Sequence, residues 1–123
     1  MKGGEAMMNQ FVCVGRLVRD LELKTSENGK TYTNMTVAVP RSYKNENGEY
    51  DTDFIDCITW GGVAENATEY CKKGDLIGLK GRVETWEKEN EQGQTEKSTL
   101  VVADKLTYLA KAKEKQSEEE MDM

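Results

Sequence analysis

The chain has 123 residues, of which 37% are hydrophobic and 33% are charged, and its formal net charge is −6 at pH 7. This length suits one globular domain, and neither a signal peptide nor a membrane-spanning segment is expected from the sequence. Three widely spaced cysteines and the absence of histidine argue against a disulfide framework or a zinc site, and they favour a reducing, cytoplasmic location.

Alternating apolar residues predict β-strands along most of the chain, and one segment with helical periodicity interrupts them. The expected elements, in chain order, are strands over 9–18 (continued past a bend over 21–25), 32–43 and 52–60, a helix over 61–75, and strands over 76–89 and 97–110. Asn-Gly pairs favour tight turns after the first two strands. This chain order is that of a mainly β domain, the OB-fold, a five-stranded Greek-key barrel with one helix between strands three and four.

The only proline, Pro40, lies in the second predicted strand. Proline has no N–H group for the hydrogen-bond ladder of a sheet. It therefore predicts a bulge or an edge position, which would redirect Arg41 and Tyr43.

The predicted helix has apolar residues at helical spacing, and Gly74 would follow its end. Its inner stripe is expected to contain Val63, Ala64, Ala67, Tyr70 and Cys71. Cys13 and Cys57 are also expected as small buried apolar residues, and no redox role is expected for any of the three cysteines.

The third strand carries large aromatic residues on the face that should meet water. Ile55 and Cys57 lie on one face of an extended chain, whereas Phe54 and Trp60 lie on the other with Asp56 between them. An inward face that already has its own apolar residues does not need these two aromatics. They therefore serve either as stacking platforms for bases or as part of a subunit interface or a support for the helix.

The fourth strand has a similar outer face, on which cations and an aromatic alternate with apolar core residues. Lys80, Arg82, Trp86 and Lys88 share this face, and Gly81 permits tight curvature. Cations bind phosphates and release counterions, while flat rings stack on unpaired bases of any sequence. The face therefore predicts a groove for single-stranded nucleic acid.

Catalysis is not expected, because the usual general base is missing and no serine or cysteine has a visible activating partner. The sequence has no P-loop, and neither a metal nor another cofactor is expected, although acidic clusters leave a Mg²⁺-dependent nuclease open. The second interpretation is an OB-fold module that binds protein or oligosaccharide.

Several segments together resemble the bacterial single-stranded DNA-binding proteins. The segments are VGRL at 14–17, Trp60 followed by Ala64-Glu65, KKG at 72–74 followed by Gly81-Arg82, and the Gln92-Gly93-Gln94 loop. The resemblance covers about residues 8–110. It implies an OB-fold that binds single-stranded DNA without sequence preference in replication, recombination and repair, and that assembles as a homotetramer. Apolar residues on both faces of the first and fifth strands independently favour a partner subunit, with a homodimer left open.

By position, the resemblance assigns the family's stacking aromatics to Tyr43, Phe54 and Trp60. A fourth usually falls at what is here Lys88, and Trp86 stands two residues earlier on the same face. The expected DNA-binding residues are Tyr43, Phe54, Trp60, Trp86, Arg41, Lys80, Arg82, Lys88 and Lys97. Asp56 is a departure, because a carboxylate on this face repels phosphate and predicts weaker or more salt-sensitive binding.

The two ends are expected to lie outside the domain, as an N-terminal extension over 1–7 and a short disordered acidic tail over 111–123. The last eight residues, 116–123, hold four of the six excess negative charges, so the rest of the chain is only mildly acidic. The resemblance implies that the tail contacts replication and repair proteins through Glu118, Glu119, Glu120, Met121, Asp122 and Met123. A solubilising tail without a partner is the alternative. So short a tail is also compatible with a phage or mobile-element protein that acts in the bacterial cytoplasm.

Overall fold

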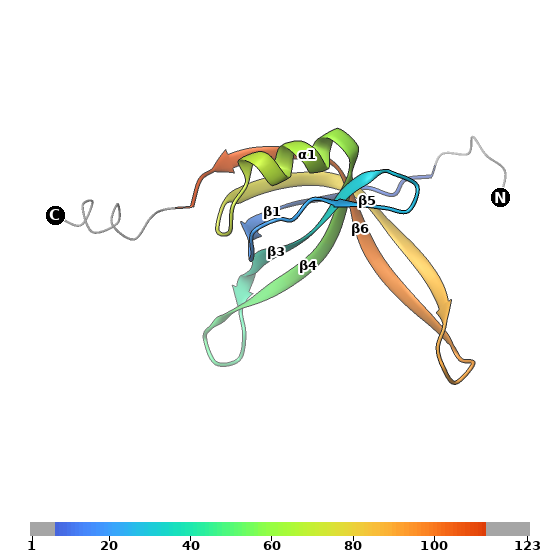
Figure 1. Cartoon of the computed structure of the whole chain (residues 1–123). Helices are drawn as coiled ribbons and strands as arrows, with labels where there is room; N and C mark the ends of the chain where they lie inside the picture. The colour runs from blue at the N-terminus through green and yellow to red at the C-terminus, as the bar shows by residue number, and fades with distance from the viewer. Residues whose placement is uncertain (1–6, 113–123) are drawn as a thin grey trace.

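The computed structural model describes residues 7–112, and in these the strands close into a barrel with one helix (Figure 1). The elements are β1 (Phe11–Leu17), β2 (Lys24–Thr25), β3 (Thr31–Lys44), β4 (Tyr50–Trp60), α1 (Gly61–Tyr70), β5 (Leu76–Glu89) and β6 (Thr95–Ala110). The strands follow the order β1-β5-β6-β4-β3, and pairing of β1 with β3 closes the barrel. This confirms the predicted OB-fold, with its helix between the third and fourth long strands.

Two predicted elements differ from those in the structure. Residues 21–25 were expected to continue the first strand, but only Lys24 and Thr25 are paired, and they pair with β3. The helix ends at Tyr70, because the backbone of Cys71 is extended (φ −106°, ψ 143°). The carboxylate of Asp75 accepts a hydrogen bond from the N–H of Lys72 at 2.8 Å, which stabilises the turn in place of a further helical turn.

The barrel interior is filled by apolar side chains from all the long strands. The buried cluster contains Leu17, Met35, Val37, Cys57, Cys71, Ile77, Leu79, Val101 and Ala103. From α1, Ala64 and Ala67 are fully buried, but Tyr70 is 54% exposed, so its predicted place in the inner stripe is wrong. A helix whose contact residues are alanines packs closely with a narrow stripe, and the bulky ring of Tyr70 remains at the surface.

Gly81 of β5 has no room for a side chain, because the backbone of β6 lies against it. A Cβ atom at this position would lie 1.9 Å from the carbonyl oxygen of Val102. Beside it, Lys80 pairs with Lys105 and Gly81 with Ala103, so Asp104 is an extra residue that forms a bulge in β6. The missing side chain leaves room for the backbone of β6 at the bulge.

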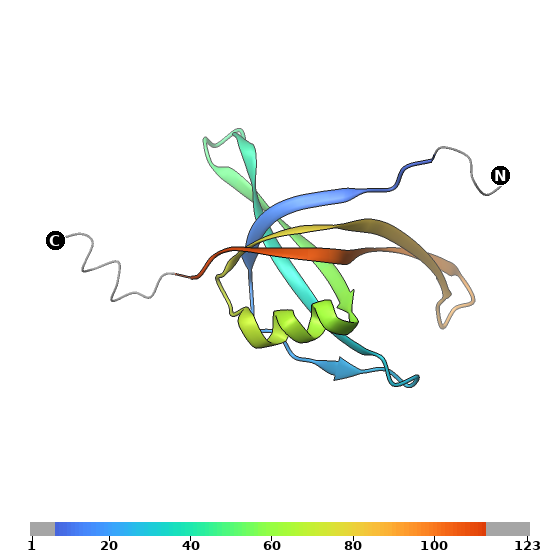
Figure 2. The same ribbon diagram turned by 90° about the horizontal axis from the view of Figure 1, so that it is seen from above.

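The β3–β4 and β5–β6 hairpins extend from the barrel as two arms, on the side away from α1 (Figures 1 and 2). The side-chain oxygen of Asn45 accepts hydrogen bonds from the N–H groups of Asn47 and Glu49 at the first tip. At the tip of the second arm, the side-chain oxygen of Asn90 accepts hydrogen bonds from the N–H groups of Gln92 and Gln94. A glycine with φ near +78° completes each turn, as this type of hairpin loop requires.

Pro40 lies in the β3–β4 arm, where the strand register shifts. The pairing is regular up to Pro40 and Thr52, and it resumes only at Lys44 and Tyr50. This confirms the bulge predicted from the proline. No helix among residues 7–112 is long and apolar enough to span a membrane.

Candidate nucleic-acid interface

The outer face of β4 carries the two aromatics that the sequence assigned to it. Phe54 is 66% exposed and Trp60 is 41% exposed, whereas Cys57 and Thr59 between them are buried. Asp56 is exposed on the same face, where it accepts a hydrogen bond from the hydroxyl of Thr36 at 2.8 Å. Neither aromatic is needed to fill the core, so both rings are available to a ligand.

A second aromatic ring lies beside Trp60. Tyr32 is directly opposite Trp60 in the β3–β4 ladder, and their ring centroids are 5.0 Å apart with an angle of 37° between the planes. Lys24 is opposite Tyr32 in the β2–β3 ladder. Directly opposed residues of antiparallel strands share a face, so one cation and two rings form a row across three strands.

Trp60 also borders a hollow of about 430 Å³ between β4, α1 and β6. Its lining includes Lys30, Val63, Arg82, Val102 and Asp104. An exposed ring beside a polar, cation-bearing hollow is the arrangement that a stacked base and its phosphate require.

On the outer face of β5, Trp86 is 57% exposed, four residues beyond Arg82 and therefore about 13 Å along the strand. Arg82 itself is held by two carboxylates. Its guanidinium lies 2.7 Å from Glu84 and 2.7 Å from Asp104 in two ion pairs. Hydrogen bonds to Glu84 and then Asp104 raise the pKa of Arg82, and a phosphate has to compete with both groups.

Arg41 is also held by carboxylates, and it lies on a different face from Phe54. Its guanidinium bonds Asp53 at 2.9 Å and lies 3.8 Å from Asp51. Asp53 pairs with Val39, whose side chain packs on the core, so this ion pair lies on the opposite side of the arm from Phe54. The hydrogen bond from Arg41 lowers the pKa of Asp53 below its ordinary value.

The remaining predicted residues divide between the two faces of the arms. Lys88 shares the strand face of Trp86 and is opposite Glu96. Lys97 is opposite Glu87, and it therefore lies on the other face of the β5–β6 arm. Tyr43 is exposed within the bulge after Pro40, where the pairing does not fix its direction. The structure thus brings Trp60 and Arg82 together, but it separates Arg41 and Lys97 from them.

Sequence reasoning missed four exposed or partly exposed residues of this region. These are Lys24, Lys30, Tyr32 and Tyr50, and the ring of Tyr50 lies 5.8 Å from the amine of Lys44. A signal for Tyr32 was present, because it lies two residues before Asn34 on the outer face of the predicted second strand. Lys24 had no such signal, since β2 pairs over only two residues.

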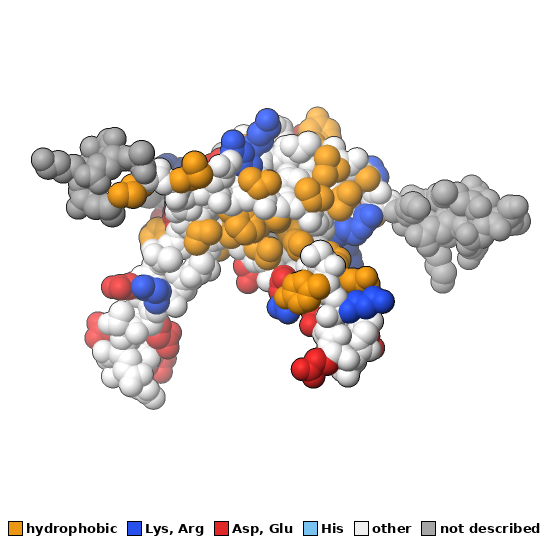
Figure 3. Space-filling model, turned by 180° about the vertical axis from the view of Figure 1, so that it is seen from behind, with side chains coloured by type: hydrophobic (Ala, Val, Ile, Leu, Met, Phe, Trp, Pro, Cys, Tyr) orange, Lys and Arg blue, Asp and Glu red, His pale blue; other side chains and the backbone are white. Residues whose placement is uncertain are grey.

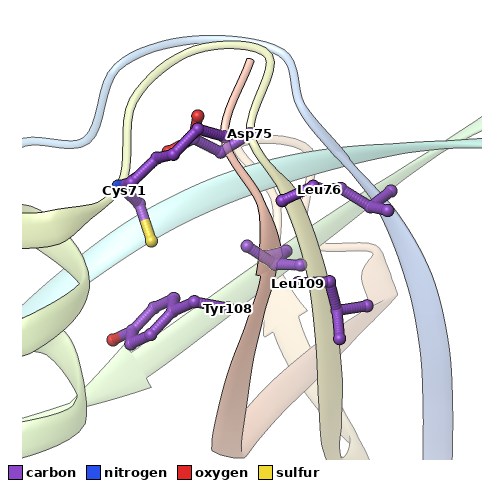
Figure 4. A pocket seen from close by; sticks show the side chains of 8 residues that line it. Cys71, Asp75, Leu76, Tyr108 and Leu109 are labelled. Atoms are coloured by element: carbon purple, nitrogen blue, oxygen red, sulfur yellow. The ribbon is translucent and has the colours of Figure 1, made fainter. Parts of the chain in front are cut away.

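A different hollow, of about 230 Å³, lies at the end of α1 (Figure 4). Cys71, Leu76, Tyr108 and Leu109 line it, and the loop with Asp75 borders it. Burial raises the pKa of the Cys71 thiol and raises that of Cys57 to about 12, so both thiols are neutral near pH 7. Tyr108 and Lys111 bring a ring and a cation to this hollow as well, but the amine of Lys111 is held by Asp75 and the carbonyl of Tyr70.

The outer side of β1 carries apolar residues that this chain leaves uncovered. Val12, Val14 and Leu109 are exposed and border one shallow hollow. Figure 3 shows apolar side chains across the body of the molecule and on one arm, with charges of both signs on the arms and Lys and Arg side chains on the body as well. The second apolar face that was expected on the fifth strand is partly covered within one chain, because Val102 is buried beside the Trp60 hollow.

Residues 7–112 contain no group of three or more His, Cys, Asp or Glu side chains that is arranged to hold a metal ion. The expected tail residues Glu118 to Met123 lie outside the described part of the chain.

Comparison with known proteins gives a match to the model of the single-strand binding protein family over residues 8–109. The chain is 44% identical over 103 residues to single-stranded DNA-binding protein A of Bacillus subtilis, covering 84% of this chain and 60% of that protein. It is 41% identical to protein B of the same organism, covering 84% of this chain and 91% of the relative. Single-stranded DNA-binding protein 1 of Lactococcus lactis is 46% identical, with 84% and 69% covered. These relatives are named for binding and not for a reaction.

Proposed function

The chain belongs to the single-strand binding protein family, and we propose that it binds single-stranded DNA without sequence preference and without a chemical step. The observation that carries this proposal is the exposed pair of Tyr32 and Trp60 beside a cation-lined hollow. Only unpaired bases offer free faces to such rings, and stacking is tolerant of sequence because every base has a π-face. Binding of this kind would protect single strands during replication, recombination and repair.

In the proposed complex, bases stack on the outer faces of β4 and β5. The stacking residues are Phe54, Trp60 and Trp86, with Tyr32 beside Trp60 and Tyr43 at the bulge of the first arm. Phosphates meet Lys24, Lys30, Lys80, Arg82 and Lys88. Arg41 and Lys97 would contact DNA only where the strand passes to the other face of an arm.

We also propose that the chain assembles as a homotetramer, with a homodimer as the alternative. The uncovered apolar side chains of Val12, Val14 and Leu109 support a contact between copies, because exposed apolar patches on a small domain mark interfaces. The acidic tail over 111–123 remains our candidate for contacts with replication and repair proteins. DNA as the ligand implies the bacterial cytoplasm as the place of action.

The test is the affinity of wild-type protein and of Trp60→Ala for fluorescein-labelled oligo-dT, measured by anisotropy. Loss of one stacked base should weaken binding by about 1–3 kcal/mol. Tyr70→Ala is the matched control, since it removes an exposed aromatic from α1.

Equal affinity of Trp60→Ala and wild type would remove Trp60 from the interface. If the wild-type protein binds no single-stranded DNA at low salt, the proposed function fails, and the OB-fold as a protein or oligosaccharide module takes its place.

A further inference from the structure

Tyr32 and Trp60 lie against each other on the outer face of the β3–β4 ladder. Their ring centroids are 5.0 Å apart, and the ring planes are inclined by 37°. Stacked bases are about 3.4 Å apart along a DNA strand, so a base between two rings needs ring centroids about 7 Å apart. The space between Tyr32 and Trp60 is too small for a base. Tyr32 therefore blocks the side of the indole that faces β3.

The other side of Trp60 faces an open hollow. β4 lies between β3 and β6 in the sheet, so Trp60 has Tyr32 on one side and β6 on the other. The hollow of about 430 Å³ lies on this second side, where Val63 of α1 and Val102 of β6 line it together with Trp60. Clefts of about 300–1,000 Å³ are typical of sites for small molecules. The hollow can therefore accept a base against the free side of the indole.

Two cations border this hollow, and they differ in their surroundings. Lys30 and Arg82 both line it. The guanidinium of Arg82 is held by Glu84 and Asp104 in two ion pairs of 2.7 Å. None of the ion pairs described for residues 7–112 includes Lys30, which is exposed. Lys30 is therefore the cation of this hollow that meets a phosphate without competition from a carboxylate.

The orientation of Trp60 depends on Tyr32 more than on its own strand. Trp60 is the last residue of β4, and Gly61 after it has a φ of +64°, so the chain leaves the strand at this point. Tyr32 is only partly exposed, and it lies between Lys24 of β2 and Trp60 of β4 in two antiparallel ladders. A ring that is held before DNA arrives loses less conformational entropy on binding.

We propose that Tyr32 is a positioning residue for Trp60, and that a base stacks only on the side of Trp60 that faces the hollow, between the indole and Val63. The phosphate of the same nucleotide meets Lys30. This inference rests on the proposed function and gives the two rings of the pair different roles. Trp60 touches the base, whereas Tyr32 holds the indole and blocks its other side.

The first experiment uses a parent protein that carries Trp86→Phe, so that Trp60 is the only tryptophan. Anisotropy of labelled oligo-dT measures affinity, and the emission of Trp60 reports on its ring. Tyr32→Ala should weaken binding by about 2- to 10-fold, the cost of ordering one side chain on binding. It should also lower the emission anisotropy of Trp60 in the free protein, because the indole moves more freely. Saturating DNA should still quench the emission.

Tyr32→Phe is the conservative variant, since it keeps the ring and removes only the hydroxyl group. It should restore both the affinity and the emission anisotropy of the parent. Tyr70→Ala is the matched control, because it removes an exposed aromatic from α1 and should change neither quantity.

A second comparison tests which side of the indole takes the base. Val63→Glu and Asn66→Glu add the same charge to α1, but only Val63 lines the hollow, and Asn66 is exposed. Val63→Glu should weaken binding and reduce the quenching of Trp60, whereas Asn66→Glu should leave both unchanged. Lys30→Gln should reduce the slope of log Kobs against log salt by about 0.7 in magnitude. Lys73→Gln, in the loop after α1, is its control.

Four results would overturn the inference. The first is a Tyr32→Ala variant with the affinity and Trp60 anisotropy of the parent. The second is weaker binding by this variant without a change in Trp60 anisotropy, which would make Tyr32 a stacking residue itself. The third is equal binding and quenching in folded Val63→Glu and Asn66→Glu, and the fourth is an unchanged salt slope in Lys30→Gln. Failure of the wild type to bind oligo-dT would instead reject the proposed function.

Discussion

Asp75 shows how a single buried side chain fixes the junction of three segments. It is 4% exposed, and it accepts hydrogen bonds from the N–H groups of Lys72 at 2.8 Å and Ala112 at 2.7 Å. Lys111 lies 3.5 Å away and also donates to the carbonyl of Tyr70. Burial alone would raise the pKa of Asp75, but these hydrogen bonds and the nearby cation together lower it.

A lowered pKa in the folded state means that the charged carboxylate contributes stability above the unfolded pKa of about 3.9. This contribution is lost as the pH falls through the folded value. We therefore expect the free energy of unfolding to decrease below about pH 4, with a smaller decrease in Asp75→Asn. At pH 7, Asp75→Asn should be less stable by about 1–3 kcal/mol, because one N–H loses its acceptor.

Urea unfolding at a series of pH values measures both effects. Asp20→Asn is the control, since the Asp20 carboxylate accepts one backbone hydrogen bond from Lys73 but is exposed. Equal free energies of unfolding for Asp75→Asn and wild type at pH 7 would show that the Asp75 carboxylate does not stabilise the fold. An equal decrease of that free energy below about pH 4 in both proteins would show that ionisation of Asp75 does not contribute to the acid sensitivity.

At the scale of the elements, the pairing of β5 with β6 beside the bulge depends on the glycine at position 81. Gly81→Ala places a methyl group 1.9 Å from a backbone oxygen, and the strands have to move apart to accommodate it. We expect a loss of about 1–3 kcal/mol of stability, or more. Gly78→Ala is the matched control on the same strand, since its nearest neighbour would be 3.6 Å away, an ordinary contact.

Thermal or urea unfolding of the two variants distinguishes steric overlap from a general effect of replacing glycine. Gly78→Ala should be as stable as the wild type or slightly more stable, because alanine restricts the unfolded chain. A Gly81→Ala variant as stable as Gly78→Ala would show that the close approach at Gly81 does not constrain the barrel.

The alternation of residues along strands made much of the fold and part of the interface predictable. Phe54, Trp60, Trp86 and Lys80 are outward where a period of two placed them. Arg41 lies on the face that simple alternation from Val39 gives it, where two aspartates hold its guanidinium, and the bulge after Pro40 does not redirect it to the face of Phe54. Local sequence determines which residues of a strand face outward, whereas a β-bulge such as that at Asp104 shifts this alternation by one residue.

Contacts between distant segments account for the rest of what sequence reasoning missed. The ion pair of Arg82 with Asp104 depends on a bulge 22 residues further along the chain. Lys97 faces away from Trp86 because it pairs with Glu87, and only the exact length of the hairpin loop decides this.

At the scale of the whole molecule, the net charge of −6 does not describe the proposed interface. Four acidic residues lie in the last eight positions of the chain, and the carboxylates around Arg41 and Arg82 are paired with cations. In the proposed complex, Lys24 and Lys30, which belong to none of these ion pairs, meet phosphate. Charges beyond about 8 Å are largely screened at physiological salt, so local arrangement outweighs the total.

The chain has two tryptophans, and each can be observed alone. Trp86→Phe leaves Trp60 as the only tryptophan, and its emission can be titrated with oligo-dT while anisotropy of labelled DNA reports binding independently. Our account predicts saturable quenching of Trp60 emission at the same DNA concentration as binding, with an affinity that falls as salt rises. Binding by anisotropy without any change in Trp60 emission would contradict it.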